Sequence, residues 1–72
     1  MKRFNKLFDR KIMIAGDKAR TIEDQRELED LGMRVEAVTA VDEIVVYEGY
    51  ISKSNKNIAT IFENYTLVVE RG

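Results

Sequence analysis

The hydrophobic pattern of this chain changes from helical to alternating spacing at Gly32, and this change constrains the fold more than any other feature. Before it, Thr21 and Asp24 have the spacing of a capping box, and apolar residues follow at helical intervals. Gly32 itself predicts a left-handed C-terminal cap, because glycine tolerates a positive φ. After it, apolar and polar residues alternate, which is typical of a half-buried strand. We therefore expect one main helix over about residues 21–31, followed by β structure.

Strands are predicted over residues 11–15, 33–41, 44–52, 58–62 and 65–70. The fourth of these runs is short enough to be a helix, but its β-branched residues favour a strand, joined to the third by a hairpin. Gly49 indicates a bulge or a close backbone approach. The first strand can be parallel or antiparallel to its neighbours, because a connection that contains a helix allows either arrangement.

These elements predict an α+β fold, with one main helix packed on a small, mostly antiparallel sheet of four or five strands. A chain of 72 residues has room for a single domain, and we expect residues 11–72 to form its α+β core. Residues 1–10 form an amphipathic basic segment in which Phe4, Leu7 and Phe8 share one side, a spacing compatible with a short N-terminal helix. We expect this apolar side to pack on the domain's own core, because a domain this small needs the apolar area.

The sequence contains no cysteine and no histidine, which excludes disulfides, thiolate nucleophiles and the commonest zinc sites. Acid–base catalysis would depend on carboxylates, lysines or tyrosines with shifted pKa values, and no spacing singles out such a group. We therefore expect a protein that is not an enzyme and that holds no cofactor and no metal ion.

The charges are unevenly distributed, although the formal net charge is only −1. One ridge of the predicted helix is acidic and is a candidate surface for a basic partner or a divalent cation, although charged helix faces are ordinary in soluble domains. It consists of Glu23, Glu27 and Asp30. The polar side of the N-terminal segment is basic and is a candidate contact for phosphates, for an anionic membrane or for a groove in a partner protein. It consists of Lys2, Arg3, Lys6 and Arg10.

Elimination favours a non-catalytic accessory or regulatory protein that acts by binding another protein. The final strand, over residues 65–71, is a candidate sheet edge with unpaired backbone groups, and a homodimer is a reasonable expectation for so small a core. Nucleic-acid binding through the basic N-terminal segment is the first alternative, and small-ligand sensing between helix and sheet is the second. No apolar run is long enough for a membrane span or a signal-peptide core, so we expect a cytoplasmic protein.

Overall fold

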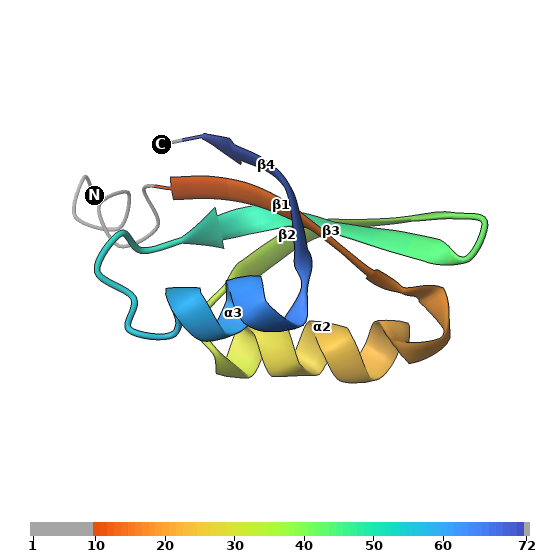
Figure 1. Ribbon diagram of the computed structural model, residues 1–72, viewed down its shortest axis with the longest axis horizontal. Coiled ribbons are helices and arrows are strands. Elements are labelled where there is room, and N and C mark those ends of the chain that lie inside the picture. Colours follow the sequence, from red (N-terminus) through yellow and green to blue (C-terminus); the bar gives the residue numbers. More distant parts are fainter. Residues whose placement is uncertain (1–9, 72) are drawn as a thin grey trace.

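Four antiparallel strands form one sheet in the computed structural model, which describes residues 10–71 (Figure 1). The strands are β1 (Arg10–Asp17), β2 (Arg34–Val41), β3 (Ile44–Ile51) and β4 (Thr66–Arg71). The helices are α2 (Thr21–Asp30), preceded by the short 3-10 helix η1 (Lys18–Arg20), and α3 (Ile58–Asn64). The sheet order is β2-β3-β1-β4, so β1 and β3 are central and β2 and β4 are the two edges.

The described elements follow one another as β-α-β-β-α-β, which is the order of the ferredoxin-like or split β-α-β motif. In this arrangement β1 is antiparallel to both of its neighbours, β3 and β4, and β2 lies on the far side of β3. The open question about the first strand is therefore settled in favour of antiparallel pairing. This motif supports many unrelated functions, so the fold alone indicates none.

Both helices cover the same face of the sheet, and the other face carries no helix among the described residues (Figure 1). Val45, Tyr47, Gly49 and Ile51 alternate along β3 on the face that the helices cover, and all four are buried. The buried apolar residues of the core are Ile12, Ile14, Leu28, Met33, Val45, Tyr47, Ile51, Ile61 and Tyr65. Each side chain of this size contributes about 1.5–3 kcal/mol when fully buried, so the layer between helices and sheet supplies most of the stability.

The predicted glycine cap of the main helix is confirmed. Gly32 has a φ of 99°, and its N–H donates to the carbonyl of Glu29 at 3.0 Å. The N–H of Met33 donates to the carbonyl of Leu28 at 2.9 Å, which completes a Schellman motif. Met33 and Leu28 are both buried, so the cap directs the chain into β2 while it adds to the core.

The predicted capping box at the start of the main helix is wrong. Asp17 accepts a hydrogen bond from the Ala19 N–H at 2.9 Å and caps η1 instead. Thr21 then donates to the carbonyl of Lys18 at 2.6 Å and lies in the first turn of α2 rather than before it. η1 precedes α2 directly, so Asp24 does not cap the helix. Its side chain is buried instead, with 5% of the residue's surface exposed.

The strand predicted over residues 58–62 is a helix, and the sheet therefore has four strands rather than five in the described part of the chain. Ile58, Ile61 and Phe62 pack toward the core at helical spacing. In so short a run the apolar pattern fits both the helical period of about 3.6 residues and the strand period of two. Contacts made by Asn55 and Asn57 favour the helix over the strand. Their side chains donate to the carbonyl of Leu31, at 3.0 and 3.1 Å, and tie the loop to the end of α2. The expected hairpin is consequently absent, and β4 begins at Thr66.

Two irregularities interrupt the sheet. The β1–β4 pairing shifts register between Met13 and Ile14, so Leu67 and Val69 lie on opposite faces of the sheet. The β2–β3 pairing shifts register opposite Gly49, which makes Glu36 an extra residue in β2. The sequence indicates a bulge or a close backbone approach at Gly49, and the close approach is confirmed, because a Cβ there would lie 2.0 Å from the Arg34 carbonyl oxygen. The bulge itself lies in the facing strand, at Glu36.

Residues 1–9 lie outside the described part of the chain, and so does the helix that the sequence predicts there. Arg10, assigned from the sequence to the N-terminal segment, is the first residue of β1 and pairs with Ile51. No helix between residues 10 and 71 is long and apolar enough to cross a membrane.

Candidate functional site: the acid–tyrosine cluster and the two sheet edges

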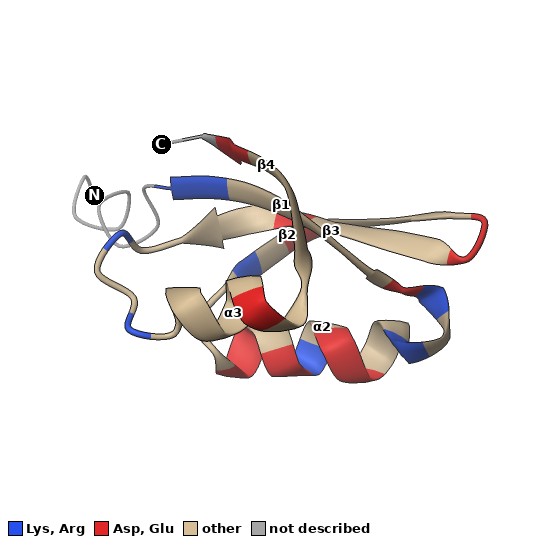
Figure 2. Ribbon diagram, in the orientation of Figure 1, with Lys and Arg blue, Asp and Glu red and all other residues tan. Residues whose placement is uncertain are grey.

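The acidic ridge predicted from the sequence lies on α2, where Glu23, Glu27 and Asp30 are all exposed (Figure 2). Of the basic set, Arg10 is described, and it forms an ion pair with Glu70 of β4. The other three, Lys2, Arg3 and Lys6, fall outside the described residues. The structure therefore places the acidic candidates on one helix face and gives no geometry for most of the basic ones.

Glu27 belongs to a polar cluster between α2 and the end of α3. The Tyr65 hydroxyl donates to a carboxylate oxygen of Glu27 and lies 3.4 Å from the carboxylate of Asp24. Arg20 approaches the same Asp24 oxygen at 3.3 Å. An open hollow of about 400 Å³ lies over these side chains, with Gly16, Asp17 and Asn64 also lining it. Because the buried carboxylate already has its partners, the cluster is a structural connection between α2 and the chain that enters β4.

Burial raises the pKa of the Tyr65 hydroxyl strongly, and the hydrogen bond to Glu27 and the charge of Asp24 raise it further. Ionisation would place a third negative charge beside two carboxylates, so the hydroxyl is a persistent donor at neutral pH.

Removal of this hydroxyl in Tyr65→Phe should destabilise the fold by about 1–3 kcal/mol, because Asp24 then stays buried without one of its donors. Since the folded-state pKa of Tyr65 lies above its ordinary value of 10, the hydroxyl contributes fully below pH 10 and its contribution falls above it. Urea unfolding at pH 7 and pH 10.5 measures both effects. Tyr50→Phe on the open sheet face is the matched control, and equal stability of the two variants would contradict the role of the cluster.

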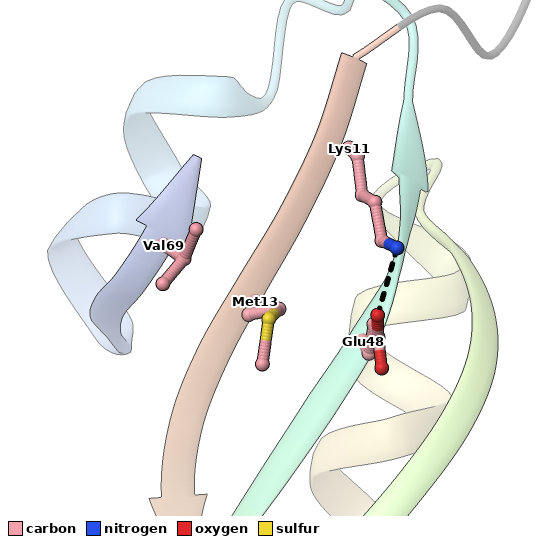
Figure 3. A pocket seen from close by; sticks show the side chains of 4 residues that line it. All are labelled: Lys11, Met13, Glu48 and Val69. Atoms are coloured by element: carbon pink, nitrogen blue, oxygen red, sulfur yellow. Dashed lines mark ion pairs between the residues drawn. The ribbon is translucent and has the colours of Figure 1, made fainter. Parts of the chain in front are cut away.

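The uncovered face of the sheet has a shallow hollow of about 190 Å³, lined by Lys11, Met13, Glu48 and Val69 (Figure 3). Lys11 and Glu48 come from the two central strands, and their side chains form an ion pair of 2.9 Å. The hollow is small and its charges neutralise each other, so it lacks the convergent polar groups of a small-ligand site.

A cation–aromatic contact lies on the same face, where the Arg34 guanidinium is 5.9 Å from the centre of the Tyr50 ring. Arg34 also donates to Glu36 at 2.9 Å. An aromatic ring flanked by a guanidinium on an open sheet is a surface on which a nucleic-acid base can stack. The neighbouring carboxylate of Glu36 reduces the positive potential that such binding needs.

The edge strand β2 is exposed over nearly its whole length. Every residue of β2 except Val35 is exposed, including Val38 with 40% of its surface accessible. From Ala37 to Val41 the strand carries no charged side chain, and it pairs with β3 on one side only. Natural edges are usually protected by lysine, proline or a bulge, and the bulge of β2 lies before this stretch, at Glu36. The residues 37–41 therefore present a regular, uncharged edge.

The other edge, β4, was predicted from the sequence as a candidate edge and is confirmed as one. Leu67, Val68 and Val69 are exposed there as well, at 38%, 48% and 37%. β4 is better protected than β2 against the addition of another strand. Its last two residues, Glu70 and Arg71, are charged, and a bulge interrupts its pairing with β1.

The sequence analysis did not identify β2 as an edge strand, because the order of the strands in the sheet decides which strands lie at its edges. The signal that could have found it is the uncharged run of residues 37–41 in a chain with 35% charged residues. The Tyr65–Asp24 connection had no sequence signal, since it joins residues 41 positions apart.

Within residues 10–71, no three His, Cys, Asp or Glu side chains are arranged to hold a metal ion. Comparison of the chain with protein-family models, with curated proteins and with solved structures gave no match.

Proposed function

We propose that this is a non-catalytic accessory or regulatory protein that binds another protein chain at the edge of its sheet. The observation that carries the proposal is the regular, uncharged and exposed edge of β2 over residues 37–41. An extended segment can add to such an edge as a further strand, with backbone hydrogen bonds for affinity and alternate side chains for specificity. The acidic ridge of α2 (Glu23, Glu27 and Asp30) and the basic segment of residues 1–10 remain predictions of further contacts.

Nucleic-acid binding is the second candidate, and the contact between Arg34 and Tyr50 on the open sheet face favours it. The surrounding ion pairs make it weaker than the first, because Lys11 and Arg34 each face a glutamate. A protein of this second kind would lose affinity steeply as salt concentration rises.

A lysine at the centre of the exposed edge tests the first candidate. Thr39→Lys should reduce the capture of a partner protein from nuclease-treated lysate at least about tenfold, because an edge lysine opposes strand addition. Thr60→Lys, an identical change at an exposed position of α3, is the matched control and should capture normally. Capture is measured by quantitative mass spectrometry of the bound fraction.

Equal capture by the two variants would contradict edge binding. A bound fraction that disappears on nuclease treatment in the unaltered protein would instead support the nucleic-acid candidate.

A further inference from the structure

We infer that the chain that adds to β2 is a second copy of this protein, paired antiparallel with its own β2 about a two-fold axis at Thr39. The inference rests on the proposed function, because it names the occupant of the same edge. It predicts a symmetric dimer in which the two sheets join into one of eight strands.

The available edge has defined ends. The bulge at Glu36 ends its regular stretch on one side, and the turn Asp42–Glu43 ends it on the other. Asp42 adopts a left-handed φ of 56°, which aspartate tolerates, and the Glu43 carbonyl accepts a hydrogen bond from the Lys18 N–H at 2.9 Å. The turn is thus anchored to the end of β1, and the five residues between bulge and turn form a fixed template.

The template is complementary to itself. With the two-fold axis at Thr39, each Thr39 lies opposite its counterpart, Val38 lies opposite Ala40 of the second copy, and Ala37 lies opposite Val41. Small and β-branched side chains therefore meet on both faces, and no like charges are opposed within the stretch.

The charges that flank the template are complementary in the same register. Because Glu36 is the extra residue of the bulge, the regular positions of the strand before Ala37 are occupied by Val35 and then by Arg34. Counting outward from Thr39 then places Arg34 of one copy just beyond Val41 of the other, beside its acidic turn Asp42–Glu43, twice in the dimer. Opposite charges at the two ends of the junction favour this register, although each Arg34 also keeps its ion pair with Glu36 of its own strand.

The geometry of antiparallel pairing also keeps the dimer two-layered. A two-fold axis between antiparallel strands is perpendicular to the sheet, so the helices of both copies lie on the same face. On that face Val38, which is 40% exposed, is then covered by the second copy. β4 is less suited to such pairing, because Glu70 and Arg71 occupy its last two positions.

Cysteine cross-linking tests the two-fold axis directly, since the chain has no cysteine of its own. Opposed residues of antiparallel strands have Cα atoms about 4.5–5.5 Å apart, which is within the range of a disulfide. Thr39→Cys should therefore form a covalent dimer under mild oxidation at micromolar concentration. Thr60→Cys on α3 should remain largely monomeric. Equal cross-linking of the two variants would overturn the inference.

Sedimentation equilibrium of the full chain tests the charges and the register. Thr39→Lys opposes two ammonium groups at the axis and should raise the dimer dissociation constant at least about 100-fold, whereas Thr60→Lys should not change it. Arg34→Glu and Glu43→Arg should each weaken the dimer, and the double variant should recover most of the loss. Circular dichroism confirms that each variant is folded.

The two proposals fail in distinguishable ways. A protein that stays monomeric in all these measurements, yet loses capture of a different protein in Thr39→Lys, would overturn the second-copy inference and keep edge binding. A monomer in which Thr39→Lys and Thr60→Lys capture partners equally would overturn both.

Discussion

Gly49→Ala should remove most of the stability of the fold. The added Cβ would lie 2.0 Å from the carbonyl oxygen of Arg34 and 3.0 Å from the Cα of Val35, both of them backbone atoms of β2. No rotamer change relieves such a contact, so β2 must move away from β3 at its bulge. We expect a cost of about 3 kcal/mol or more, the upper end for overpacking, against a total stability of about 3–5 kcal/mol for so small a core.

Thermal unfolding followed by circular dichroism measures this effect, with an expected fall in Tm of more than about 10 °C. Gly16→Ala is the matched control in the neighbouring strand β1. Its Cβ would meet side-chain atoms, Asp24 Oδ2 at 3.1 Å and Tyr47 Cε2 at 3.3 Å, which can give way. We expect a cost of about 1 kcal/mol there, and similar losses in the two variants would contradict the importance of the backbone approach.

Tyr47→Ala should have the second large effect, a loss of about 3–5 kcal/mol. The Tyr47 ring is fully buried between the sheet and α2, and its hydroxyl donates to the carbonyl of Thr21 at 3.0 Å. Burial raises the pKa of this hydroxyl, so it remains a donor at neutral pH.

Tyr47→Phe separates the two contributions, because it keeps the ring and removes only the hydrogen bond. We expect it to cost about 1 kcal/mol. Circular dichroism shows whether Tyr47→Ala still folds, and urea unfolding measures the loss in Tyr47→Phe. If Tyr47→Phe were as damaging as Tyr47→Ala, the hydrogen bond and not the buried ring would be the main connection between β3 and α2.

Local rules predicted the parts of the fold that local chemistry determines. The glycine cap at Gly32 and the buried face of β3 follow from conformational freedom and from a period of two, and both are as expected. The close approach at Gly49 was also indicated, because a glycine inside a β-branched strand has few other uses.

The errors arose where distant contacts decide. Residues 58–62 fit both periods, and the bonds from Asn55 and Asn57 to the carbonyl of Leu31 select the helix. Asp24 looked like a capping residue, but contact with Tyr65 gives it an interior position. The candidate edge at β2 required the sheet order, which no pattern within one strand contains.

The central position of β1 has a consequence for how the chain acquires its structure during synthesis. β1 leaves the ribosome before the other described strands, yet both of its neighbours, β3 and β4, are encoded well after it. Until Ile44–Ile51 emerges, β1 has no strand to pair with, and its second side is completed only by Thr66–Arg71. Folding is therefore expected to wait for nearly the whole described chain, since pairing of segments distant in sequence is slow. A nascent chain that stops before β4 would expose one side of the strand that the finished sheet protects most completely.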